Sequence, residues 1–125
     1  MEQRKTSMVC AGIDVAKKHL DAAVHGGAEA RFANDARGIA ELGLWLAREG
    51  VSRVGIEATG GYEKQVRVFL AGAGLKVVVH QPLEVRLFEK LKRKRAKNDS
   101  IDARIIAAAT LQVDAVRAAA ELRLN

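Results

Sequence analysis

Two short apolar segments, 51–56 and 75–80, each come after a stretch whose apolar residues recur at helical spacing. The second contains the run Val77-Val78-Val79, which is typical of a parallel strand that is buried on both faces. Parallel strands are joined through crossover connections, and these crossovers are right-handed in almost all proteins. The alternation therefore predicts an α/β fold in which helices pack against a sheet.

Three strands are expected before the first helix. Segments 8–16, 19–25 and 29–34 are separated by the polar turn 17–18 and by Gly26-Gly27, and such short turns join antiparallel neighbours. The order strand, strand, strand, helix, strand, helix, strand, helix, helix gives a mixed five-stranded sheet with flanking helices. The residues expected to share one helix face are Ile39, Leu42, Trp45 and Leu46 in the first helix, Tyr62, Val66, Phe69, Leu70 and Ala73 in the second, Leu83, Leu87, Phe88 and Leu91 in the third, and Ile101, Ile105, Ala108 and Gln112 in the fourth, with Asp102 and Ile106 beside them.

Helix starts are expected at residues that suit the first turn. Asn34-Asp35 supplies an N-cap for the first helix, and Pro82 fits the first turn of the third. Asn98 or Asp99 is the expected cap of the fourth helix, which places Asp102 inside that helix.

The totals describe one globular domain. A chain of 125 residues can bury a single core, and no apolar run reaches the roughly 18 positions of a membrane span. The single cysteine, Cys10, has no disulfide partner, which indicates a reducing compartment. Three Phe, one Trp and one Tyr are too few for base stacking to dominate nucleic-acid binding. We therefore expect a cytoplasmic protein without a membrane partner.

Two acids interrupt segments that are otherwise apolar. Asp14 lies within segment 8–16, and Glu57 directly follows segment 51–56. If the two strands are parallel neighbours, both carboxylates lie near the carboxyl ends of adjacent strands, where ligand sites form in such sheets. Considered singly, Asp14 could bond to the following turn and Glu57 could face the dipole of the next helix. Their convergence favours a functional role, because buried acids are costly.

A second pair of acids, Asp99 and Asp102, follows the most basic stretch of the chain. Three residues apart on a helix, the two carboxylates share one face and repel each other unless a cation lies between them, although Asp99 alone could be a plain N-cap. Stretch 86–97 holds seven basic residues and one acid, so its charge equals the +6 of the whole chain. Its candidates for binding nucleic acid are Lys90, Lys92, Arg93, Lys94, Arg95 and Lys97, and a solvated surface run or a localisation-like tract are the alternatives.

Four carboxylates in one place raise each other's pKa unless divalent ions compensate their charge. Oxygen ligands of this kind select Mg²⁺ or Mn²⁺. Two such ions about 3.5–4 Å apart can activate an attacking oxygen and stabilise a leaving one in phosphodiester chemistry. Asp14, Glu57, Asp99 and Asp102 together therefore predict a metal-dependent site that acts on nucleic acid.

Three ordered motifs resemble the amino-terminal domain of IS110-type transposases, also called DEDD transposases. They are Gly12-Ile13-Asp14-Val15-Ala16-Lys17, Gly55-Ile56-Glu57-Ala58-Thr59-Gly60-Gly61-Tyr62 and Lys97-Asn98-Asp99-Ser100-Ile101-Asp102-Ala103. The resemblance covers nearly the whole chain. It implies a RuvC-like, RNase H-like fold whose catalytic acids, matched here by Asp14, Glu57, Asp99 and Asp102, bind Mg²⁺ for DNA strand cleavage and exchange. It also implies guidance by a structured RNA that the mobile element encodes, and a nucleoid-associated location in a bacterial or archaeal cell.

The sequence departs from the family pattern in two ways. Asn98 and Ser100 stand in a motif that often reads Lys-Thr-Asp-Arg-Xaa-Asp-Ala, which keeps both acids and loses one positive charge. Family members continue through a helical connector into a second domain with a nucleophilic serine, whereas this sequence stops at Asn125. We therefore expect residues 1–112 to form the catalytic domain and residues 113–125 to begin the connector. A homo-oligomer is expected for the full-length protein.

Two other functions fit the same residues. A stand-alone RNase H-like nuclease or junction resolvase needs no further domain for cleavage. A non-catalytic nucleic-acid-binding fragment uses the basic stretch and treats the acids as structural or vestigial. An actin-like ATPase is contradicted by the length of the chain, because its cleft needs two such domains.

Several further residues have both a functional and a structural explanation. Thr59-Gly60-Gly61 precedes a helix and could hold a phosphate with free N–H groups, although a glycine turn is the commoner explanation. His19, His25 and His80 lack metal-ligand spacing and are expected to be structural or surface residues. Arg104 is expected to pair with a nearby acid, with a phosphate as the alternative.

Overall fold

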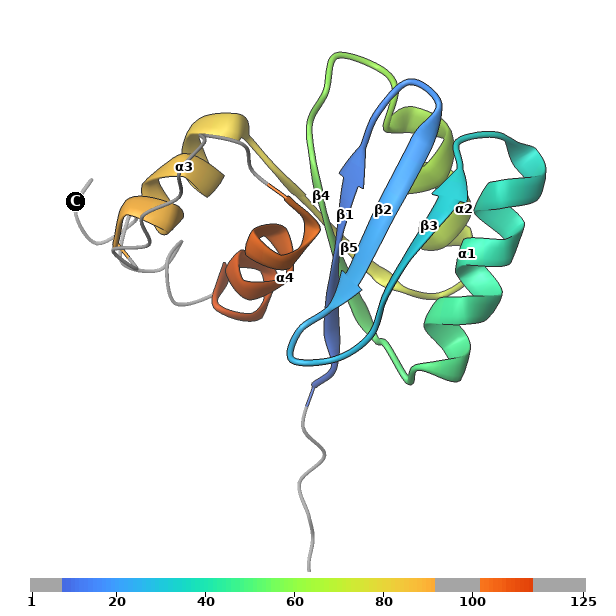
Figure 1. The fold of residues 1–125 in the computed structure, drawn as a ribbon, viewed down its shortest axis with the longest axis horizontal. Coiled ribbons are helices and arrows are strands. Elements are labelled where there is room, and N and C mark those ends of the chain that lie inside the picture. Colours follow the sequence, from blue (N-terminus) through green and yellow to red (C-terminus); the bar gives the residue numbers. More distant parts are fainter. Residues whose placement is uncertain (1–7, 92–101, 114–125) are drawn as a thin grey trace, which may run out of the picture.

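The computed structural model describes residues 8–91 and 102–113. Its five strands form one sheet in the order β3-β2-β1-β4-β5, which lies between two groups of helices in Figure 1. The strands are β1 (Cys10–Val15), β2 (His19–Val24), β3 (Glu29–Ala33), β4 (Arg53–Glu57) and β5 (Lys76–His80), and the helices are α1 (Ala36–Arg48), α2 (Lys64–Gly72), α3 (Pro82–Leu91) and α4 (Ala103–Leu111). The predicted order of strands and helices is therefore confirmed.

The sheet is mixed, as predicted. β1 pairs antiparallel with β2, and β2 pairs antiparallel with β3. β4 lies parallel beside β1, and β5 lies parallel beside β4. The helices α1 and α2 follow the strands β3 and β4 and provide the crossovers that the parallel pairs require. The carboxyl ends of β1 and β4 are consequently neighbours at the same edge of the sheet.

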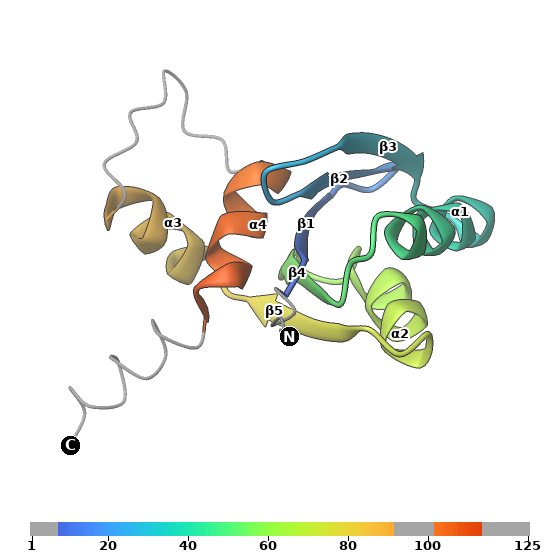
Figure 2. The same cartoon turned by 90° about the horizontal axis from the view of Figure 1, so that it is seen from below.

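Helices cover both faces of the sheet (Figures 1 and 2). α1 and α2 lie on one face, whereas α4 lies on the other with α3 packed against it. The main core lies under α1 and α2, where Ala11, Ile13 and Val15 of β1 are buried. Because side chains alternate along a strand, Gly12 and Asp14 face α4 instead.

The first helix begins and ends where the sequence predicts. Oδ1 of Asp35 accepts a hydrogen bond from the Gly38 N–H at 2.8 Å and thereby caps α1. After the helix the chain turns at Gly50, whose φ of 75° favours glycine. Between these ends, Ile39 and Leu42 are buried against the sheet.

Two glycines determine how closely α4 approaches the sheet. Gly12 of β1 and Gly55 of β4 are directly paired in the parallel register. A Cβ atom on Gly12 would overlap backbone atoms of Ala103 and Ala107 in α4, and a Cβ atom on Gly55 would overlap the Thr110 side chain. Only a residue without a side chain leaves room for such an approach. We call the Gly12–Gly55 pair the glycine seat of α4.

The carboxyl end of α4 is held by two buried side chains of the sheet. Nη1 of Arg53 donates to the carbonyl oxygen of Thr110 at 3.2 Å, where the helix dipole favours a cation. Nε2 of His80 lies 3.0 Å from Oγ1 of Thr110, and the same hydroxyl donates to the carbonyl oxygen of Ile106 at 2.7 Å. Because the hydroxyl proton is used on Ile106, Nε2 of His80 is the donor to Thr110. The expected structural role of His80 is confirmed.

The predicted start of the fourth helix is wrong, and its predicted side agrees with the buried residues only at the adjoining Ile106. The helix begins at Ala103 because Asp102 has an extended backbone and its side chain accepts bonds from the N–H groups of the first turn. The predicted face included Gln112, which is exposed. The glycine seat instead accepts small side chains, and the buried residues are Ala103, Ile106, Ala107, Ala109 and Thr110.

The second and third helices match their predicted faces in part. Val66, Leu70 and Phe88 are buried as expected. Tyr62 is 51% exposed because α2 begins only at Lys64, after a loop that its own hydrogen bonds hold. Phe69 and Leu83 are also exposed, since α1 and α2 contact each other little and α3 packs on α4 through Val85.

Some predicted residues fall outside the described part of the chain. They are Asp99, Lys92, Arg93, Lys94, Arg95 and Lys97, whereas Lys90 lies in α3. Among the helices of the described ranges, none is long and apolar enough to cross a membrane.

Candidate active site

One polar residue from each strand lies in a single row across the α4 face of the sheet. Arg31 of β3 pairs with Asp21 of β2, and Asp21 pairs with Asp14 of β1. Glu57 of β4 pairs with His80 of β5. Asp14 and Glu57 each lie one residue beyond the last matched pair of β1 and β4, so they complete the row. The sheet thus places the two predicted strand acids side by side.

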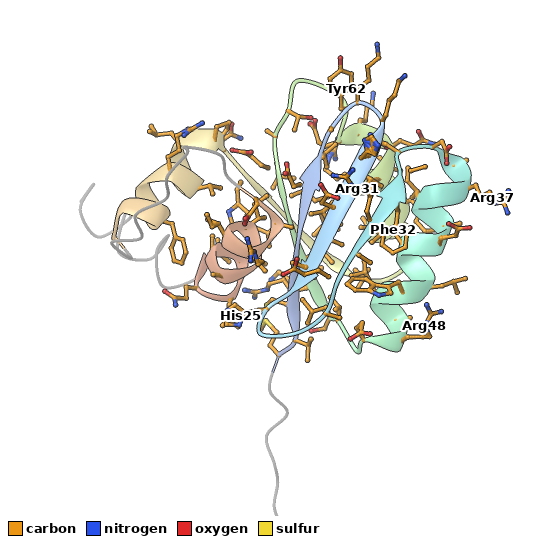
Figure 3. All side chains as sticks on the ribbon, in the orientation of Figure 1. His25, Arg31, Phe32, Arg37, Arg48 and Tyr62 are labelled. Atoms are coloured by element: carbon orange, nitrogen blue, oxygen red, sulfur yellow. The ribbon has the colours of Figure 1, made fainter. Side chains whose placement is uncertain are left out.

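Asp21 and Arg31 form a bidentate ion pair within this row. Nε and Nη2 of Arg31 donate to Oδ1 and Oδ2 of Asp21 at 2.7 and 3.1 Å. Figure 3 shows Arg31 and its neighbour Phe32 on opposite sides of β3. Asp21 lies directly opposite Asp14, where two like charges repel each other. Arg31 therefore neutralises the negative charge of Asp21, which would otherwise repel Asp14.

Asp14 is held in a position that disfavours its ionised form. Partial burial is the largest cause that raises the pKa of its carboxyl group, and the charges of Asp21 and Asp102 raise it further. Arg31 acts in the opposite direction without reversing the effect. Any additional cation nearby would stabilise the ionised form of this carboxyl group.

Glu57 is affected in the same way at the end of β4. Partial burial raises the pKa of its carboxyl group most, the charge of Asp14 raises it further, and Arg86 of α3 lowers it. The charge of Asp14 thus acts directly on Glu57. Two neighbouring acids at strand ends, both with raised pKa values, are typical of sites where a cation or a proton is bound.

Asp102 projects toward the same region from the start of α4. Its Oδ1 accepts from the backbone N–H groups of Arg104 and Ile105 at 3.0 and 3.2 Å, and its Oδ2 accepts from Nη2 of Arg104 at 2.9 Å. Partial burial raises the pKa of Asp102, but the hydrogen bonds from Arg104 and Ile105 outweigh burial, so the pKa lies below its ordinary value. Asp102 is therefore ionised, and both of its oxygens already accept hydrogen bonds.

A cavity of about 360 Å³ lies between the start of α4 and the part of the polar row on β1, β2 and β3, and Glu57 does not line it. It is lined by Asp14, Asp21, Ala22, Glu29, Ala30, Arg31, Asp102, Ala103 and Arg104. Four carboxylates against two guanidinium groups make its lining acidic, which attracts cations.

The acids suit a hard divalent cation in chemical type. Carboxylate oxygens are the usual ligands of Mg²⁺ and Mn²⁺, and the pKa values of Asp14 and Glu57 are raised first by burial and then by neighbouring carboxylates. Within residues 8–91 and 102–113, however, no three His, Cys, Asp or Glu side chains come together as a metal-binding group. Asp102 turns its oxygens to Arg104 and to its own helix, and Asp99 is not among these residues.

Asn34 ties together the loops that follow β1 and β4. Its Nδ2 donates to the carbonyl oxygen of Ala16 at 2.9 Å and to that of Tyr62 at 3.2 Å. The two loops leave the strands that carry Asp14 and Glu57. Asn34 therefore fixes these two segments relative to each other.

The loop that follows Glu57 is held in place by the carboxylate of Glu63. Oε1 of Glu63 accepts from the N–H and hydroxyl of Thr59 at 3.1 and 2.6 Å and from the Gly61 N–H at 3.0 Å. The hydrogen bond from the Thr59 hydroxyl is the main cause that lowers the pKa of Glu63 to about 2. Gly60 and Gly61 have φ values of 85° and 131°. The predicted glycine turn is confirmed, and the N–H groups of Thr59 and Gly61 already have a carboxylate partner.

Asp14 thus lies near two other predicted acids, Glu57 at the end of the neighbouring strand and Asp102 at the start of α4. Sequence reasoning missed the glycine seat and the Asp21–Arg31 pair. A signal for the seat was present, because Gly12-Ile13-Asp14 and Gly55-Ile56-Glu57 repeat the pattern glycine, isoleucine, acid. In parallel neighbours this repeat puts each glycine on the same face as the acid two residues later.

A family model of IS110-type DEDD transposases, described as "Transposase", matches residues 11–123. The chain belongs to the IS110-type transposase family. The match includes the positions of all four predicted acids and of the basic stretch.

A solved structure identifies the fold of this transposase domain. The structure titled "T. thermophilus RuvC in complex with Holliday junction substrate" resembles it with a TM-score of 0.60 and 18% sequence identity. The likeness covers 89% of this chain and 94% of that chain. It confirms the predicted RuvC-like, RNase H-like fold. Among curated proteins, none matches the chain.

Proposed function

We propose that this transposase domain binds Mg²⁺ or Mn²⁺ through Asp14, Glu57, Asp99 and Asp102 and so supports DNA strand cleavage and exchange. The observation that carries the proposal is the Asp14–Glu57 pair, in which neighbouring strand ends hold two acids whose pKa values are raised. Such a pair weakens the folded state when both groups are ionised, which argues against a purely structural role. Binding of a divalent cation would offset that penalty.

In this proposal the fold contributes to the chemistry by holding the acids in fixed positions. Asp14 and Glu57 are carried by paired strands, and Asp102 is carried by a helix that rests on the glycine seat. Arg53 and His80 hold the other end of the same helix. When bound, the metal ions polarise the phosphodiester and activate the attacking oxygen.

We further propose that the basic residues Lys90, Lys92, Arg93, Lys94, Arg95 and Lys97 bind nucleic-acid phosphates beside these acids. Phosphate contacts position a strand without reading its sequence. Sequence selection would then fall to a structured guide RNA, with DNA as the substrate. We place the catalytic domain at residues 1–112 and the start of a connector at residues 113–125, and we expect the full-length protein to be a homo-oligomer.

Calorimetric titration with Mn²⁺ tests the proposed metal site. We expect Asp14→Asn to weaken binding at least about ten-fold, because the substitution removes an anionic ligand. Glu41→Gln is the matched control, since Glu41 is an exposed acid of α1 on the opposite face of the sheet. Equal heats from wild type and Asp14→Asn would contradict the proposal.

A stand-alone nuclease for branched DNA is the second candidate. It is favoured by the coverage of 94% of a RuvC chain whose structure contains a Holliday junction. This candidate predicts that the 125-residue chain alone cleaves a four-way junction in Mg²⁺ and that Asp14→Asn does not. Salt-sensitive binding without cleavage, unchanged when all four acids are replaced, would instead identify a non-catalytic binding domain.

A further inference from the structure

Arg104 contacts two acids on different elements. Its Nη2 donates to Oδ2 of Asp102 at 2.9 Å, and its Nε lies 3.8 Å from Oε2 of Glu29 on β3. The Arg104 side chain is 69% exposed, and that of Glu29 is 56% exposed. All three residues line the acidic cavity beside Asp14. The guanidinium group is therefore positioned between an acid of the proposed metal site and an acid outside it.

The two oxygens of Asp102 have different tasks. Oδ1 accepts from the N–H groups of Arg104 and Ile105 and so maintains the first turn of α4. Oδ2 is the oxygen left for an external cation, and the Arg104 guanidinium group is bonded to it. A divalent ion on Oδ2 would face this positive charge at close range. The ion and Arg104 therefore compete for the same oxygen.

We propose that Arg104 is an exchangeable counter-cation, which neutralises Asp102 before a divalent ion binds and moves onto Glu29 when the ion takes Oδ2. The inference rests on the proposed function, because it assigns Oδ2 of Asp102 to the metal. Helix α4 does not have to move in this exchange, since its cap uses Oδ1 and its other contacts lie at the glycine seat and at Thr110.

The exchange requires little free energy. Ion pairs between exposed side chains contribute little to stability, so transfer of a guanidinium group from one carboxylate to another is close to balanced. Arginine has five N–H donors and loses none of its bonding capacity on Glu29. Arg31 cannot take this role, because both oxygens of Asp21 already bind it in a bidentate arrangement.

A double-mutant cycle on Mn²⁺ affinity tests the exchange. Arg104→Gln frees Oδ2, and we expect binding to tighten about two- to five-fold. Glu29→Gln removes the alternative partner, and we expect binding to weaken by a similar factor. In the Arg104→Gln background the Glu29→Gln change should have little effect, because no guanidinium group then needs a new partner. Affinities are measured by calorimetry on the 125-residue chain, with folding checked by thermal melting.

The control pair separates exchange from general electrostatics. Arg37 and Glu41 form an exposed pair at 3.6 Å on α1, far from the cavity, and their cycle should show no coupling in Mn²⁺ affinity. Additive effects of Arg104→Gln and Glu29→Gln would overturn the exchange while leaving metal binding intact. Absence of Mn²⁺ binding by the wild type would overturn both the exchange and the proposed function.

Discussion

At the scale of single residues, Asp14 and Glu57 are held where burial and mutual repulsion oppose their ionised form. Their pKa values in the folded chain are raised above the ordinary ones. Their contribution to stability is therefore complete at a pH below the ordinary pKa and is lost as the pH rises through the raised pKa. Residues that reduce stability in this way are typical of functional sites.

Replacement of Asp14 by asparagine should stabilise the metal-free protein. At pH 7 in the presence of a chelator, we expect Asp14→Asn to raise the melting temperature by about 2–4 °C, because it removes a partly solvated charge from an unfavourable position. The gain should shrink as the pH falls, since the wild-type carboxyl group then becomes neutral as well. Excess Mn²⁺ should reverse the order, because only the wild type keeps all its ligands. A lower melting temperature for Asp14→Asn with chelator at pH 7 would count against this account.

At the scale of elements, α4 decides where Asp102 lies. The helix contacts β1 through the glycine seat and is tied to β4 and β5 by Arg53 and His80. Both ends of the helix are therefore fixed by the sheet. The position of Asp102 is therefore determined by the packing of α4 on the sheet.

Replacement of Gly12 by alanine should lift α4 from the sheet. The new methyl group would overlap backbone atoms of Ala103 and Ala107, which have no flexible end to move aside. We expect a loss of about 1–3 kcal/mol in the free energy of unfolding, measured by urea denaturation. Gly72→Ala is the control, because its Cβ meets open space at the end of α2, and it should be neutral or stabilising by up to about 0.5 kcal/mol.

The element order was predictable because hydrophobic periodicity is local. The meeting of Asp14 and Glu57 followed from one topological step, the parallel pairing of their strands. The start of α4 did not follow, since Asp99 and Asp102 are equally good caps until the glycine seat fixes the helix. The prediction that Tyr62 belongs to the face of the second helix failed for a similar reason. The carboxylate of Glu63 captures the preceding N–H groups and delays α2, which no periodicity reveals.

At the scale of the whole molecule, the net positive charge is concentrated in one stretch of the sequence. Stretch 86–97 carries a charge equal to the +6 of the chain, so the remaining residues sum to zero. The cavity at the polar row is lined by four acids and two arginines. A concentrated basic stretch suits contact with a polyanion, whereas an acidic cavity suits a cation.

Neutralising cations of the basic stretch should reduce the salt dependence of DNA binding. For Arg93→Gln with Arg95→Gln, the slope of log K against log salt on duplex DNA should become shallower by up to about 1.8, or 0.9 for each lost phosphate contact. The matched control is Arg37→Gln with Arg48→Gln, which removes the same charge from the outer side of α1 (Figure 3). Fluorescence anisotropy over a salt series measures both slopes, and equal reductions would show that only net charge matters.

The glycine seat also constrains how the sequences of relatives can change. At position 12 the overlap is with backbone atoms of α4, and no substitution on the helix removes a backbone atom. At position 55 the overlap is chiefly with Oγ1 of Thr110, which a residue without a side-chain hydroxyl would remove. In an alignment of the family, position 12 should remain glycine. Positions 55 and 110 should covary, with alanine at the first accompanied by alanine or glycine at the second.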